Sequence, residues 1–256
     1  MVSEASLPLA TVFAFLMVLA RVSGAFIFVP IPGIQTASQP VRAVLSLSLT
    51  MALFPLWPAP PSVPSVGLLI EWLIVEAAVG LSIGLVVGFL AEAFGVFGQM
   101  VGLHSGHSFA STVDPNTQAD SGIFVVLGQS IASLLFFATG LHRNVIAIFA
   151  KSLQTQPPGM YTLSPSAGEV IIRLSATIFS TGFKLALPLI ALLVMVDLAI
   201  ALLSLVNAQL QLNSLAFPAK ILVTLAFLAA IAAVFPQVYT DYAGRLFSSL
   251  PAVTTH

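Results

Sequence analysis

Ionisable side chains that interrupt apolar runs are the residues of this chain most able to do chemistry. Arg21, Glu76, Arg173, Lys184 and Asp197 all fall within or near such runs. A charge at the middle of a bilayer costs from about 3 to more than 10 kcal/mol, so we expect these groups to face protein or water and to pair. Paired structural charges are the favoured hypothesis, because no chain of Asp, Glu and His follows one helix face; a proton or ion relay is the alternative. The predicted buried charges are Arg21, Arg42, Glu76, Lys184, Asp197 and Lys220.

A second group of residues recurs every four positions between residues 71 and 95. Glu76, Gly80, Gly84, Gly88 and Glu92 form one slowly drifting stripe if this segment is helical. Small residues at this spacing let another backbone approach closely, which predicts a helix-packing seam over Glu76, Gly80, Gly84 and Gly88. A passage lined by small residues, with Glu76 and Glu92 as ion sites, is the alternative.

Catalytic and metal motifs are weak in this sequence. His104 and His107 lie three residues apart, but structural zinc needs four ligands and catalytic zinc three. Ser105, Ser108 and Asp114 suggest a triad with these histidines, yet the sequence has no GxSxG, P-loop, GxGxxG or HExxH motif. The sequence therefore predicts no catalytic, metal-binding or cofactor-binding residue and no enzyme; an intramembrane protease is the third hypothesis.

The composition indicates an integral membrane protein. Hydrophobic residues make up 58% of the 256 residues and charged residues 7%, whereas a soluble domain carries about 25% charged residues. The net charge of -1 argues against a nucleic-acid partner, because no basic patch could displace phosphate counterions. With no cysteine, the chain forms no disulfide or thiolate metal site.

The elements that must position these residues are apolar helices. Continuous runs rich in Leu, Ala and Val favour helices over the alternating pattern of a membrane barrel. Six such segments are predicted at residues 7–29, 41–57, 68–97, 123–139, 170–206 and 215–235. Pro188 predicts a kink in the fifth segment. Charges and breaks inside the spans favour a subunit packed in a larger assembly, since such breaks are tolerated where protein or water surrounds them.

One polar stretch, GHSFASTVDPNTQADSG at residues 106–122, separates two of these segments. Together with the preceding glycines it resembles a motif of the flagellar export protein FliR family and its virulence-associated type III secretion counterparts, G-x-x-x-G-x-x-x-G-x-(S/A)-x-A-x-x-x-D-P. The matching positions are Gly98, Gly102, Gly106, Ser108, Ala110, Asp114 and Pro115.

Further stretches along the chain resemble the same family. The matching positions are Arg21, Gly24, Pro32, Pro40, Arg42, Glu76, Gly140, His142, Ser152, Pro157, Gly159, Pro188 and Asp197. After the long helix the family carries R-x-x-P-Q-x-N-x-F-x-x-G-F-P-x-K. This chain keeps Gln209, Phe217, Pro218 and Lys220 of that motif but has Leu205, Ala208, Gln211, Asn213 and Ala216 at the other positions. The chain therefore resembles a divergent member.

The resemblance implies an all-α polytopic membrane protein of broken helices packed as hairpins, forming a single export-gate domain over residues 1–256. It implies a multi-pass subunit of the type III export gate in the bacterial inner membrane, at the base of a flagellum or injectisome. The implied partners are FliP-like and FliQ-like subunits, FlhB-like and FlhA-like components, and unfolded secreted proteins. The overall resemblance favours a flagellar system over a virulence system.

For the polar loop, the resemblance implies a plug in the central pore. Asp–Pro favours a turn, the Ser, Thr and Asn side chains suit a wet lumen, and the flanking glycines suit hinges. The predicted gate residues are Gly106, Ser108, Phe109, Val113, Asp114, Pro115 and Gly122, with Phe109 and Val113 sealing the lumen. An ordinary exposed loop is the alternative for this segment. A small-molecule or ion secondary transporter is the alternative for the whole protein.

Overall fold

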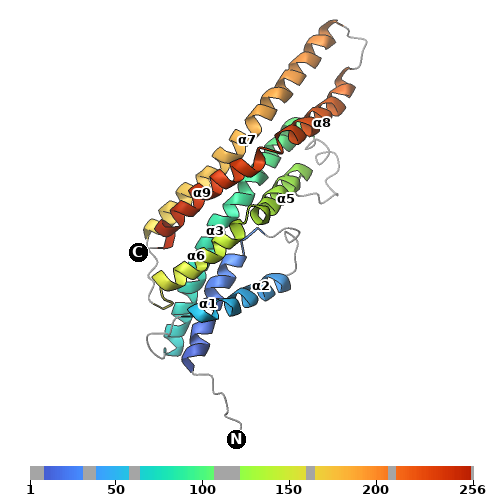
Figure 1. The fold of residues 1–256 in the computed structure, drawn as a ribbon. Coiled ribbons are helices and arrows are strands. Elements are labelled where there is room, and N and C mark those ends of the chain that lie inside the picture. The colour runs from blue at the N-terminus through green and yellow to red at the C-terminus, as the bar shows by residue number, and fades with distance from the viewer. Residues whose placement is uncertain are drawn as a thin grey trace. The chain divides into compact units, whose positions relative to one another are not determined.

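In the computed structural model, every regular element of the described residues is helical (Figure 1). The described ranges are 9–30, 39–57, 64–106, 122–159, 165–206 and 212–254. The helices are α1 (Leu9–Phe26), α2 (Gln39–Ala52), the 3₁₀ helix η1 (Phe54–Leu56), α3 (Val66–Ser105), α5 (Ile123–Ala138), α6 (Leu141–Thr155), α7 (Pro165–Val206), α8 (Leu212–Ile231) and α9 (Phe235–Thr254). Each of the six predicted apolar segments contains a helix, and the all-α membrane fold class is confirmed.

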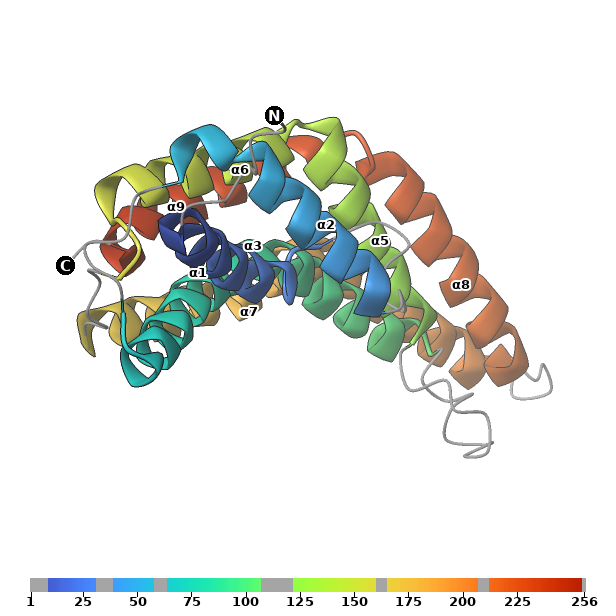
Figure 2. The ribbon, with the colours of Figure 1, turned by 90° about the horizontal axis from the view of Figure 1, so that it is seen from below.

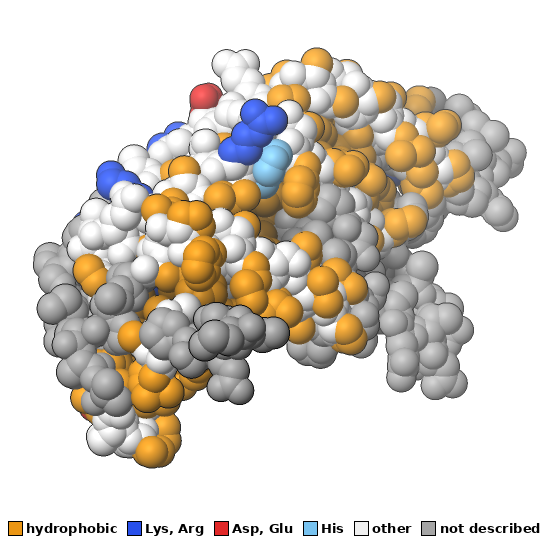
Figure 3. Space-filling model, turned by 60° about the horizontal axis from the view of Figure 1, so that its bottom comes forward, with side chains coloured by type: hydrophobic (Ala, Val, Ile, Leu, Met, Phe, Trp, Pro, Cys, Tyr) orange, Lys and Arg blue, Asp and Glu red, His pale blue; other side chains and the backbone are white. Residues whose placement is uncertain are grey.

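Three of these helices are long and apolar enough to cross a membrane by themselves. They are Leu9–Phe26, Val66–Ser105 and Ala167–Leu205. Two helix pairs reach the same criterion only together, and each pair is sharply bent: α5 with α6 by 69°, and α8 with α9 by 67°. The prediction of broken spans is confirmed at these two bends, whereas α7 continues as a helix through Pro188. Hydrophobic side chains cover much of the described surface in Figure 3, and charged ones are few.

Two helices, α6 and α9, were not predicted from the apolar runs. Both are amphipathic: α6 carries Arg143 and Lys151, and α9 carries Asp241 and Arg245. At the start of α6, the Gly140 N–H donates to Phe137 O at 3.1 Å, and the Arg143 N–H donates to Gly140 O at 3.0 Å. This turn lets the chain leave α5 in a new direction.

The chain divides into two compact units, and four helices contribute residues to both. Unit 1 holds residues 1–89, 136–175 and 243–256, with a core that includes Met17, Val22 and Ile83. Unit 2 holds residues 90–135 and 176–242. In unit 2 the Phe94 ring meets those of Phe235 and Tyr239 edge to face, with centroids 5.8 and 5.5 Å apart. The single domain over residues 1–256 stays a prediction.

Within unit 1, α1 lies against the first part of α3 along a line of glycines (Figures 1 and 2). A methyl group added at Gly80 would overlap the carbonyl oxygen of Arg21, and one added at Gly84 would overlap that of Ala25. At Gly88 the added carbon would lie 3.0 Å from Phe28 O. The contact is therefore made by backbone on backbone, which requires residues without a side chain.

Candidate functional site: the Arg21–Glu76 cluster and the base of the polar loop

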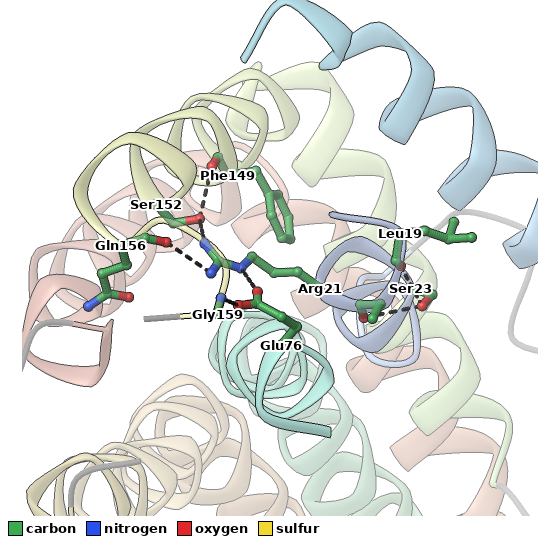
Figure 4. Close-up of polar contacts among 9 residues, drawn as sticks. Leu19, Arg21, Ser23, Glu76, Phe149, Ser152, Gln156 and Gly159 are labelled. Carbon is green, nitrogen blue, oxygen red and sulfur yellow. Dashed lines mark hydrogen bonds and ion pairs between the residues drawn. The ribbon is translucent and has the colours of Figure 1, made fainter. Parts of the chain in front are cut away.

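A charged pair lies inside unit 1, at the contact between α1 and α3. Arg21 Nε donates to Glu76 Oε2 at 2.6 Å, and both side chains are fully buried (Figure 4). The backbone of Arg21 rests on Gly80, one turn after Glu76. The close approach at this glycine brings the arginine side chain within reach of the carboxylate.

The remaining nitrogens of Arg21 reach the end of α6. Nη1 donates to Ser152 Oγ at 3.3 Å, and Nη2 donates to Gln156 O at 3.0 Å (Figure 4). Ser152 donates its own hydroxyl hydrogen to Phe149 O at 2.9 Å, so its oxygen is free to accept from Arg21. The last carbonyls of a helix lack intrahelical donors and carry partial negative charge, which makes this a favourable place for a cation.

The second carboxylate oxygen of Glu76 holds the turn that follows α6. Glu76 Oε1 accepts a hydrogen bond from Gly159 N–H at 3.1 Å. Gly159 has φ = +84°, a backbone conformation that strongly favours glycine. A Cβ at this position would also lie 3.1 Å from the indole ring of Trp72. Glu76 and Trp72 of α3 therefore fix this turn from two sides.

The cluster joins three segments that lie far apart in the sequence: α1, α3 and the end of α6. Both charges of the pair are neutralised, and each makes a further hydrogen bond to the same C-terminal part of α6 and its turn. Because the partners are in place and the groups are buried, the geometry favours an anchor between segments over a proton or ion relay.

The other predicted buried charges have different surroundings in the isolated chain. Arg42 is half-buried, and its Nη1 donates to Ile27 O near the end of α1. Within unit 2, Lys220 Nζ lies 2.5 Å from Asp197 Oδ1, with side chains 17% and 52% exposed. Lys184 is exposed on α7. Burial of these groups by neighbouring subunits stays a prediction.

The base of the polar loop lies in unit 2, between the end of α3 and the start of α5. Methyl groups added at Gly98 and Gly128 would overlap the carbonyl oxygens of Phe124 and Phe94, so these two helices also meet backbone to backbone. Gly106 follows α3 with φ = +83°, typical of a residue that ends a helix. Gly122 O accepts the N–H of Val125 at 2.8 Å.

The loop itself, residues 107–121, lies outside the described residues. The predicted gate residues there are Ser108, Phe109, Val113, Asp114 and Pro115, and His107 of the weak metal motif lies there too. The other histidine of that motif, His104, has Nδ1 2.9 Å from Met100 O of its own helix.

The fold and these contacts define a class: a polytopic helical membrane protein with a buried ion pair and closely packed helices. Residues 12–246 match the family described as "Bacterial export proteins, family 1". The chain therefore belongs to this family of bacterial export proteins, as its resemblance to FliR predicted.

Several similar proteins carry the name "Flagellar biosynthetic protein FliR". That of Escherichia coli (strain K12) is 31% identical over 217 residues, which cover 84% of this chain and 81% of that protein. That of Pectobacterium carotovorum is 28% identical over 240 residues, covering 92% and 87%. That of Bacillus subtilis (strain 168) is 26% identical over 217 residues, covering 82% and 83%.

Proposed function

We propose that this chain, a membrane subunit of the flagellar type III protein-export apparatus, helps to form and close the channel for unfolded exported proteins. The observation that carries the proposal is the match to the export family over residues 12–246. The flagellar name of its relatives supports a flagellar system over a virulence system, and a part in protein export over solute transport.

The proposed gate is the polar loop between Gly106 and Gly122. Its base is well suited to hold a moving segment, because α3 and α5 contact each other directly through Gly98 and Gly128. In the closed state Phe109 and Val113 seal the lumen, and the polar residues around Asp114 face water. An unfolded chain entering the channel displaces the loop. The energy for transport comes from other components, and the role of this subunit is gating rather than catalysis.

The proposed setting is the bacterial inner membrane, in contact with FliP-like, FliQ-like, FlhB-like and FlhA-like proteins. The exposure of α7 supports contact with other membrane subunits. Only 17% of its most apolar window is buried within the chain, against 56% for α3. So much apolar surface needs a cover of lipid or protein. The Arg21–Glu76 cluster would keep α1, α3 and α6 fixed while the loop moves.

Deletion of residues 108–119 in the assembled apparatus tests the gate. We expect a raised resting ion conductance in membranes that contain the complex, with the amount of complex unchanged. A Gly/Ser loop of the same length is the first control: it keeps the connection but lacks Phe109 and Val113, so it should leak as well. Shortening the proline-rich connection at residues 58–63 is the second control and should not leak. Unchanged conductance in the 108–119 deletion, with normal assembly, would contradict the gate.

A further inference from the structure

Lys184 is an exposed charged residue on the apolar helix α7. Its side chain makes no hydrogen bond or ion pair with any residue of the described ranges, whereas Arg21 and Lys220 each meet a carboxylate. On α7, Thr181, Ala186 and Leu189 are buried, and Lys184 points away from them on the exposed side. We call this exposed side of α7 the outer face. It includes Ser180, Phe183, Lys184, Leu187, Pro188 and Ala191.

Lys184 lies near the middle of α7, far from both of its ends. The helix has 42 residues, or about 63 Å at 1.5 Å per residue. Lys184 lies 19 residues from Pro165 and 22 from Val206, about 28 and 33 Å from the two ends by the same rise. A lysine near a helix end can extend past that end into water. Lys184 is too far from both ends of α7 to do so, and where this part of α7 lies within a bilayer its charge calls for a counter-charge or water.

Pro188 adds a second unmet polar group at the same place. A proline has no N–H, so it cannot donate to the carbonyl four residues earlier, which is that of Lys184. Lys184 therefore carries both an ammonium group with three hydrogen-bond donors and a backbone carbonyl that lacks its usual helical donor. A helix outside α7 can supply partners for both groups.

The outer face also has the shape for another helix. Ser180 and Ala191 are small and exposed on either side of Lys184, so a second backbone can approach closely. Phe183 and Leu187 beside them are 46% and 45% exposed, which provides apolar area to bury. A helix can supply both a carboxylate and a side-chain donor from neighbouring positions.

We propose that the outer face of α7 docks a membrane-embedded helix of a partner subunit, and that a carboxylate of that helix pairs with Lys184. The inference rests on the proposed function in one respect, because it takes this chain to work inside a multi-protein membrane complex. It adds the place of contact and the chemistry of the partner: an apolar helix with an Asp or Glu at the depth of Lys184.

Photocrosslinking in the intact complex tests the contact. A photoreactive phenylalanine analogue replaces Phe183 in the full-length chain, in the wild-type background and in Lys184→Met, Lys184→Arg and Lys151→Met. Lys151 is also an exposed lysine, but it lies on the amphipathic helix α6, so it serves as the matched control. We expect a protein crosslink in the wild type, at least a tenfold loss in Lys184→Met, and retention in Lys184→Arg and Lys151→Met.

The crosslinked peptide decides the partner's chemistry. It should come from an apolar helix with an Asp or Glu within one turn of the crosslink, and exchanging that acid for Lys in a Lys184→Glu background should restore the crosslink. Crosslinks to lipid alone, a protein crosslink that Lys184→Met leaves unchanged, or a partner peptide without an acid would each overturn the proposal. Failure of the proposed function is a separate result, since it shows in the conductance of the loop deletion, which does not involve Lys184.

Discussion

Removing the buried ion pair of unit 1 one side at a time, and then both sides together, gives the sharpest test of its role as an anchor. Arg21→Met leaves the buried Glu76 with a single hydrogen bond, from Gly159 N–H. Glu76→Leu leaves the guanidinium with two neutral acceptors, Ser152 Oγ and Gln156 O. Loss of one partner of a buried pair costs about 3–5 kcal/mol, so we expect each single variant to lose that much free energy of unfolding.

The stability of the double variant shows whether Arg21 and Glu76 act as a coupled pair or contribute independently. It leaves no buried charge, but it deprives Gln156 O and Gly159 N–H of their partners, each at a cost of about 1–3 kcal/mol. We therefore expect Arg21→Met with Glu76→Leu to lose about as much stability as one single variant. The sum of the single losses would be about 6–10 kcal/mol, which implies a coupling energy of at least about 3 kcal/mol.

Unfolding of the detergent-solubilised protein, titrated with dodecyl sulfate and followed by tryptophan fluorescence, measures these differences. The chain has two tryptophans, and Trp72 packs beside the Gly159 turn, so its emission reports on the cluster directly. Conservative changes at Lys151 serve as a control for altered detergent binding. Strictly additive losses in the double variant would refute the coupled anchor, and so would single losses below about 1 kcal/mol.

Two pairs of matched glycine substitutions test the close contacts. Gly80→Ala should weaken the α1–α3 contact, with a cost of at least the 1–3 kcal/mol typical of overpacking, whereas Gly67→Ala on the same helix meets nothing within 4 Å and should be neutral or stabilising in the same titration. Gly159→Ala should cost more than Gly140→Ala, because both have positive φ but only the first also meets a ring, that of Trp72. Equal costs within either pair, measured as midpoint shifts, would contradict the packing described.

Composition and hydrophobic runs were enough to predict the six apolar helices, because a helix that lies in lipid or in a protein interior is apolar all round. The same signal could not predict α6 and α9. Their polar faces, with Arg143 and Lys151 in α6, interrupt the hydrophobic run, and a search for continuous apolar segments passes over them.

The glycine spacing predicted a closely packed face on α3, but the sequence could not say which helix it meets. That depends on tertiary structure: the partner is α1, and the contact places Arg21 beside Glu76, 55 residues away. The contribution of α6 to the Arg21–Glu76 cluster was harder still to predict. Ser152 and Gly159 stood out only through the family motif, and Gln156 contributes a backbone carbonyl, which no side-chain pattern can reveal.

The charges on the apolar helices differ in where their partners lie. Some are paired inside the chain, and others are exposed on α7. Arg21 and Glu76 are neutralised within unit 1, so that part can fold with its charges already paired. On α7, Asp197 meets Lys220 with half of its surface still exposed, and Lys184 meets no charge in the described chain. An exposed charge on an apolar helix within a bilayer favours an assembly in which a neighbouring helix supplies a counter-charge. The internal pair therefore joins α1, α3 and the end of α6, while in the proposed assembly Lys184 would make the exposed face of α7 selective for a helix that carries an acid.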